Sequence, residues 1–146
     1  MAITTNAICN SFKEELFEAI HDFTPSTGDV FKLALYTSAA TIGADTTSYT
    51  SSGEVGDTGQ YAAGGGALVN ALVTVDGTTA FVNFDNLSFT GVTLTARGAL
   101  VYNTSNSNKA VAVLDFGGDK TATAGTFTIQ FPAAASNTAI IRIGNP

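Results

Sequence analysis

The sequence predicts a mainly β protein, an antiparallel β-sandwich or jelly-roll-like domain of about eight strands with one N-terminal α-helix. Apolar residues recur with a helical period only before residue 24, and from residue 30 they alternate with a period of two. Gly, Asn, Asp and Pro separate the alternating segments, as in sandwiches and barrels. No helical segment lies between them, which disfavours a parallel α/β fold. The 146 residues fit one compact unit, with a helix and connector at 1–29 and a β domain at 30–146.

The spacing of apolar residues predicts a helix over residues 5–22. Its apolar face comprises Ile8, Phe12, Leu16, Ala19, Ile20 and Phe23. Ser11 and Glu14 resemble a capping box, with Thr5 or Asn6 as the alternative cap for an earlier start, and Pro25 ends the helical pattern. This face either packs on the protein's own sheet or docks against another subunit, because both uses need the same spacing.

Eight segments are expected to form strands: 30–36, 67–75, 79–84, 87–95, 98–102, 110–116, 126–131 and 139–143. Asp76-Gly77 predicts a tight hairpin turn between the second and the third. The polar residues 103–109 predict another hairpin connection.

Residues 37–66 form a long segment rich in Thr, Ser, Gly and Ala. Irregular segments of this length are rare in compact domains, so we expect it to be functional or ordered by a neighbour. Tyr49 and Tyr61 in this segment are candidates for intersubunit or ligand contact. The glycine run 64–66 lacks the Lys-Ser/Thr of a phosphate loop and predicts a sharp turn or a close backbone approach.

The composition is poor in charge. Charged residues make up 12% of the chain, about half of the usual ~25%. A charge-poor surface favours burial against neighbours, although a Thr/Ser-rich β surface without a partner has the same composition. The net charge is −6 and the six Lys and Arg residues are scattered, so we expect neither nucleic-acid nor membrane binding.

The residues offer little for catalysis. His21 is the only histidine and Cys9 the only cysteine, which excludes an intrachain disulfide and a multi-cysteine zinc site. We expect Cys9 to be a small buried thiol. Asp45, Glu54 and Asp57 are interpreted as solvated loop charges, with a weak cation site as the alternative. The sequence therefore predicts no enzyme, no catalytic residue, no metal and no cofactor.

Four runs of residues carry a resemblance to a known group of proteins. They are KLALYTSAATIGADTTSYTSSGEV, GQYAAGGGAL, LTARGALVYNTSNSNKAVAVLDFGGDK and GTFTIQFP. Over about residues 31–143 the chain resembles small predicted structural proteins of tailed bacteriophages. TARGALVYN followed by AVAVLDFG and DK is the most specific part. The resemblance implies a component of the virion without catalytic activity.

Our leading expectation is a capsid decoration, or cement, protein that binds the major capsid protein or another virion protein. It would be a homo-oligomer, with a trimer favoured, and its contacts would come from the N-terminal segment or the 37–66 segment. The interface candidates are Phe12, Leu16, Ile20, Tyr49 and Tyr61. A receptor-recognition module on a fibre or spike, and a head–tail or tail adaptor, are the alternatives. The first residues lack a secretory pattern, so we expect synthesis in the host cytoplasm and a place in the virion.

Overall fold

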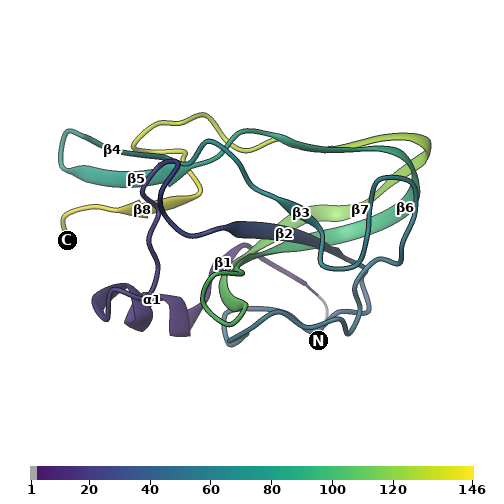
Figure 1. Ribbon diagram of the computed structural model, residues 1–146, viewed down its shortest axis with the longest axis horizontal. Helices are drawn as coiled ribbons and strands as arrows, with labels where there is room; N and C mark the ends of the chain where they lie inside the picture. Colours follow the sequence, from purple (N-terminus) through teal and green to yellow (C-terminus); the bar gives the residue numbers. More distant parts are fainter. Residues whose placement is uncertain (1–2) are drawn as a thin grey trace.

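A computed structural model describes residues 3–146 as two antiparallel sheets in a sandwich-like arrangement with one short N-terminal helix (Figure 1). The elements are β1 (Ala7–Ile8), α1 (Asn10–Phe17), β2 (Phe31–Tyr36), β3 (Gly66–Ala67), β4 (Leu72–Asp76), β5 (Thr79–Asn83), β6 (Leu87–Asn103), β7 (Lys109–Ile129) and β8 (Ile141–Ile143). One sheet has the order β1-β7-β6-β2-β3 and the other β4-β5-β8. The predicted fold class is confirmed.

The β6–β7 hairpin is the centre of the five-stranded sheet. Its strands have 17 and 21 residues, so each contains two of the segments that the sequence suggested as separate strands. A register shift between Ala96 and Gly98 accommodates the irregular residues inside β6 without ending it. The middle of the hairpin is the core of the protein, where Leu100 and Val113 face each other and are at most 1% exposed.

The predicted tight hairpin turn is confirmed, because β4 and β5 pair from Leu72–Asn83 to Asp76–Thr79. Its two loop residues are Gly77 and Thr78, one position later than the predicted Asp76-Gly77. Gly77 has a φ of 62°, a conformation that glycine adopts without strain. The single strand expected over residues 67–75 is wrong. The chain turns at Asn70, with a φ of 54°, so that β3 joins one sheet and β4 the other.

The helix is shorter than the expected 5–22. Ala7 and Ile8 instead pair with β7, and the Cys9 amide donates to the Val111 carbonyl at 3.0 Å. The expected capping box is also wrong. Cys9 is the N-cap without a side-chain hydrogen bond, and the buried Ser11 hydroxyl has no partner among the described residues.

A tight reversal ends α1 and turns the following chain back onto the protein. The Ala19 amide donates to the Leu16 carbonyl and the Ile20 amide to the Glu15 carbonyl, with Ala19 at a φ of 58°. The reversal brings His21 against Phe12, with 4.8 Å between ring centroids. The apolar face of α1 thus packs partly on its own chain.

The 37–66 segment is hydrogen-bonded to strands of its own chain. The Ala110 amide donates to the Thr47 carbonyl at 3.0 Å, and the Gln60 amide donates to the Thr90 carbonyl at 3.0 Å. At Gly65 the expected close backbone approach is confirmed. A Cβ on Gly65 would lie 1.8 Å from the Leu33 carbonyl oxygen.

Candidate interaction surface

The C-terminal end of α1 presents apolar side chains to solvent. Phe17 is 95% exposed, and Leu16 beside it is only half-buried. An open groove of about 500 Å³ separates this end of the helix from β8. It is lined by Ile8, Phe12, Lys13, Leu16, Phe17, Ile141, Arg142 and Ile143.

One face of the three-stranded sheet adjoins this groove and is wholly apolar. The register pairs Val73 with Val82 and Val82 with Ile141 in one row, and Val75 with Ala80 and Ala80 with Ile143 in the next. Residues paired in register point to the same side of a sheet. We call the six residues Val73, Val75, Ala80, Val82, Ile141 and Ile143 the end face.

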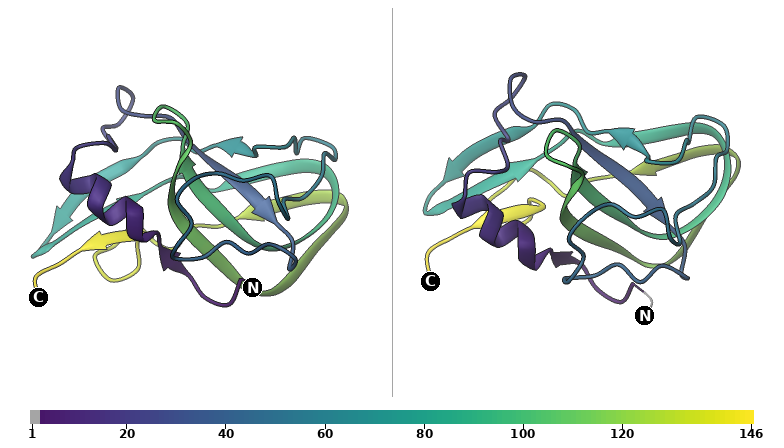
Figure 2. Two further views of the ribbon diagram at one scale, coloured as in Figure 1. Left: turned by 90° about the horizontal axis from the view of Figure 1, so that it is seen from below. Right: turned by 60° about the horizontal axis from the view of Figure 1, so that its bottom comes forward.

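The end face continues the core beyond the point where other elements cover it. Exposure rises from 5% at Ile141 to 61% at Ile143, and from 47% at Val73 to 67% at Val75. Figure 2 shows why: the β4–β5 hairpin and β8 extend at one end of the molecule, past the five-stranded sheet. Contiguous exposed apolar surface of this kind marks sites of protein–protein contact.

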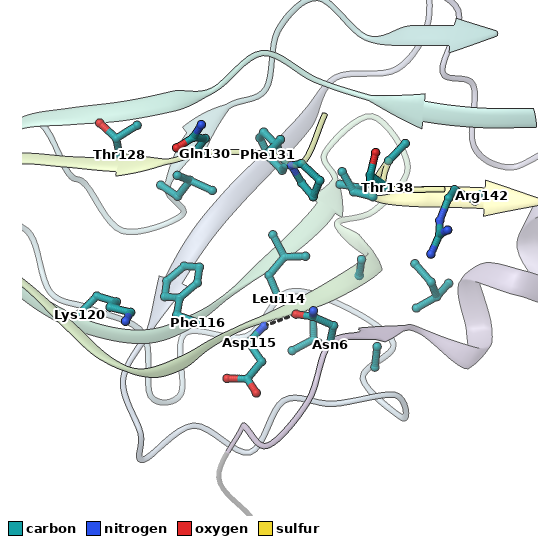
Figure 3. A pocket seen from close by; sticks show the side chains of 18 of the residues that line it. Asn6, Leu114, Asp115, Phe116, Lys120, Thr128, Gln130, Phe131, Thr138 and Arg142 are labelled. Carbon is teal, nitrogen blue, oxygen red and sulfur yellow. Dashed lines mark hydrogen bonds between the residues drawn. The ribbon is translucent and has the colours of Figure 1, made fainter. Parts of the chain in front are cut away.

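A second, larger groove of about 680 Å³ runs between β7, β1 and the segment 130–142 (Figure 3). Leu114, Phe116 and Phe131 give it apolar walls, and Lys120 and Arg142 contribute positive charge. Ile8 and Arg142 line both grooves, so the two grooves adjoin at β8.

The acidic residue of this groove is already paired. The Asp115 carboxylate accepts hydrogen bonds from the Gly117 amide and from Arg97, and these bonds lower its pKa. The Asp115 amide in turn donates to the Asn6 side-chain oxygen at 2.6 Å. Lys120 and Arg142 are the charges left to attract a ligand, which would have to be acidic or largely apolar.

His21 lies in a buried polar network that includes four other residues. Its Nε2 is 2.6 Å from Glu15 Oε2, and the Lys109 ammonium donates to Glu15 Oε1 at 3.3 Å. Asn103 Nδ2 donates to His21 Nδ1 at 3.0 Å and to Asp29 Oδ2 at 2.7 Å. Because Nδ1 accepts this bond, the proton of the neutral ring lies on Nε2 and points to Glu15. The network joins α1 to β6 and β7, and the His21 side chain, 0% exposed, is not accessible to a substrate.

Glu54 is the centre of a hydrogen-bond network within the 37–66 segment. Its carboxylate accepts hydrogen bonds from the Tyr49 hydroxyl, from the Tyr61 hydroxyl at 2.8 Å and from the Gly64 amide at 2.6 Å. The Tyr61 hydroxyl also accepts a bond from the Leu35 amide at 2.8 Å. Burial, together with the nearby Glu54 charge, raises the pKa of Tyr49 and of Tyr61 above the ordinary value. The arrangement ties the segment to β2, and it contradicts the interpretation of Glu54 as a solvated charge.

Cys9 is a buried thiol, as predicted. It is 0% exposed, and burial raises its pKa to about 11. A thiol of this kind is almost fully protonated near neutral pH and is a poor nucleophile.

The five predicted interface residues do not form one surface. Phe12 and Tyr61 are each 1% exposed and belong to the core. Tyr49 stacks on Tyr102 with 4.9 Å between centroids, and Ile20 is half-buried. Leu16 and the buried Phe12 line the groove beside β8, and of these two Leu16 is the more exposed.

The residues that sequence reasoning missed are Phe17, Val75 and Ile143. Phe17 lies outside the apolar stripe of the helix, which was a signal that nothing in the chain would cover it. Val75 and Ile143 alternate with other residues as in any strand, and the pattern does not say whether a second layer lies over them.

Within residues 3–146 no cluster of three His, Cys, Asp or Glu side chains is placed to hold a metal ion. No helix in this described part of the chain has the length and apolar character to cross a membrane. No family model, no curated protein and no solved structure matches the chain.

Proposed function

We propose that this chain is a non-enzymatic structural protein of a bacteriophage particle, a capsid decoration protein that binds the outer capsid lattice. The observation that supports this best is the apolar surface at one end of the molecule. Phe17 on α1, Val75 on β4 and Ile143 on β8 are each at least 61% exposed there. The resemblance of residues 31–143 to structural proteins of tailed phages indicates that the particle is a phage virion. The low proportion of charged residues agrees with a surface that is buried against neighbouring subunits.

The mechanism is burial of this apolar surface against capsid subunits. Transfer of a large apolar side chain from water to an interface contributes about 1.5–3 kcal/mol, and a specific contact usually buries about 1,200–2,000 Å² in total. The groove of about 500 Å³ beside Phe17 gives the capsid an apolar depression to fill. The buried networks around Glu15 and Glu54 keep the fold rigid, so little ordering accompanies binding.

The receptor-recognition alternative receives less support from the same geometry. A glycan site would use exposed tyrosines, whereas the Tyr49 and Tyr61 hydroxyls are both bonded to Glu54 inside the chain. The copy number per particle separates the two functions. Hundreds of copies agree with decoration, and a few to dozens would assign the chain to a fibre or tail.

The direct test is co-sedimentation of the purified chain with expanded phage capsids assembled without it. We expect saturable binding, weakened about tenfold or more by Phe17→Ser and by Val75→Ser, since each change removes an exposed anchor. Thr126→Ser, an exposed position on β7, is the matched control and should bind like the unchanged chain. Absence of binding, or full binding by both anchor variants, contradicts the proposal.

A further inference from the structure

β4 leaves the three-stranded sheet with an open edge. It has five residues and is longer than the other strands that end a sheet, because β1 and β3 have two each and β8 has three. All five residues are exposed, and no segment within residues 3–146 pairs with its outer side. Native proteins usually protect such edges with Lys, Pro, a bulge or a covering loop. β4 has none of these, so its unpaired backbone groups are complementary to another extended strand.

The hairpin fixes which backbone groups face outward. The Gly77-Thr78 turn makes Asp76–Thr79 the closing hydrogen-bonded pair, so that Leu72, Thr74 and Asp76 direct their amides and carbonyls toward β5. The amides and carbonyls of Val73 and Val75 therefore point away from the sheet. A partner strand must offer two matching residues at this same spacing.

We propose that β4 pairs antiparallel with the β4 of a second copy of this chain, about a two-fold axis beside Thr74. Val73 then forms two backbone hydrogen bonds with Val75 of the partner subunit, one through its amide and one through its carbonyl. Val75 does the same with Val73 of the partner subunit, so the outward groups of both strands are paired. The two Thr74 residues face each other as a pair without backbone bonds. A hydroxyl bond between facing threonines of neighbouring antiparallel strands already occurs between Thr95 and Thr121 on β6 and β7, at 2.9 Å.

The charges of β4 favour a second copy over a foreign strand. Asp76 is the only charged residue of β4, and the two-fold places it opposite Leu72 of the partner subunit. The two Asp76 carboxylates lie at opposite ends of the paired strands, so no like charges meet. A foreign strand would find only one charged side chain on β4, Asp76, to recognise by an ion pair. A second copy needs no ion pair, because its β4 forms backbone hydrogen bonds to every outward amide and carbonyl of Val73 and Val75.

Pairing also doubles the end face. The two-fold axis is perpendicular to the sheet, so the apolar rows of both copies lie on the same side of one continuous six-stranded sheet. The contact closes at two copies, which differs from the trimer that the sequence led us to favour. It does not depend on the particle in which the chain works, since it forms between free subunits.

The mass of the purified chain in solution tests the pairing, measured by light scattering after size exclusion from about 10 µM to 1 mM. We expect a shift with concentration from the monomer of 14.9 kDa to twice that mass. Val75→Pro removes one outward amide and no amide bonded to β5, and Val75→Lys adds an edge charge. Both should remain monomeric, while Thr126→Lys on exposed β7 should dimerise like the unchanged chain.

A cysteine at the proposed axis gives a second measurement that does not rely on loss of association. Facing residues of a pair without backbone bonds have Cα atoms about 4.5 Å apart, within the range of a disulfide. Thr74→Cys should cross-link to a covalent dimer under mild oxidation, whereas Thr90→Cys on β6 should not, and buried Cys9 should stay unreacted. A chain that stays monomeric, forms trimers, dimerises despite Val75→Pro and Val75→Lys, or cross-links equally at both positions overturns the proposal.

Discussion

Glu15 and His21 lie six positions apart and hold Oε2 and Nε2 2.6 Å from each other, across the reversal that ends α1. Both side chains are at most 10% exposed, and the Lys109 ammonium reaches the same carboxylate from β7. The Glu15–His21 bond therefore fixes the helix to the segment that follows it, and the Lys109–Glu15 ion pair fixes it to β7.

Removal of this carboxylate should destabilise the fold. Glu15→Ala leaves the His21 donor buried without its partner, and we expect the free energy of unfolding to fall by about 2 kcal/mol. Glu14→Ala on the exposed side of the helix should change it by less than about 0.5 kcal/mol. Urea unfolding followed by circular dichroism measures both. Equal effects of the two variants would show that the bond contributes nothing specific.

Alkaline pH should unfold the protein. Burial raises the pKa of Cys9 from 9.0 to about 11 and that of Tyr102 from 10.0 to about 12. The folded state thus favours the neutral forms, and this stabilisation is complete below the ordinary pKa values. It is lost as pH rises through the folded values, so stability should fall between pH 9 and pH 12.

Tyr102→Phe isolates one contribution to this pH dependence. The variant keeps the ring and removes the titration, so its stability should fall less steeply above pH 10 than that of the unchanged chain. Unfolding midpoints at a series of pH values provide the slopes. Identical slopes would assign the alkaline loss to other groups.

Gly65 should not tolerate a side chain. It has a φ of 78°, and a Cβ would lie 1.8 Å from the Leu33 carbonyl oxygen. Gly65→Ala should destabilise the fold by more than about 2 kcal/mol. The alanine would have to adopt a strained positive φ, and the Leu33 backbone would also have to move away from its Cβ. Gly56→Ala in the same segment meets nothing within 4 Å and should be nearly neutral. Thermal melting of the two variants compares them, and similar melting temperatures would contradict the close approach.

Two phenylalanines of α1 should separate stability from contact. Phe12 is 1% exposed and Phe17 is 95% exposed. Phe12→Ala should cost about 3–5 kcal/mol of stability through the cavity it leaves. Phe17→Ser should leave stability within about 0.5 kcal/mol of the unchanged chain. Chemical denaturation of both variants checks the difference, and strong destabilisation by Phe17→Ser would place Phe17 in the fold instead of the interaction surface.

The sequence predicted those elements whose signals are local. Asp76-Gly77 predicted a tight turn, and the turn forms with Gly77 and Thr78 as its two loop residues and Gly77 in the positive-φ position. The helix was predicted too long, because Ile8 has the spacing of the helical stripe but lies in β1, opposite Ala112 of β7. The spacing of apolar residues does not show that a strand about a hundred positions later in the chain will pair with this segment.

Most residues of the interaction surface could not be predicted from the sequence. Tyr49 and Tyr61 are of a residue type that is common at interfaces, but in the structure both hydroxyls donate hydrogen bonds to Glu54 of the same chain. Val75 and Val101 both belong to β-strands rich in apolar residues, yet Val75 is 67% exposed and Val101 is 0% exposed. The difference arises because the five-stranded sheet ends before it reaches β4, which is a property of the packing of whole sheets.

The register of the large sheet also sets the order in which the protein can fold. β1 pairs with Ala112 and Val113, and β2 pairs with residues from Gly98 to Asn103. Within residues 3–146, the β4–β5 and β6–β7 hairpins join strands that follow each other directly, and the second is complete only at Ile129. Closing long loops before gaining contacts slows folding. During synthesis the ribosome must therefore release most of the chain before its core closes, and until then the open strands depend on dilution or chaperones to avoid aggregation.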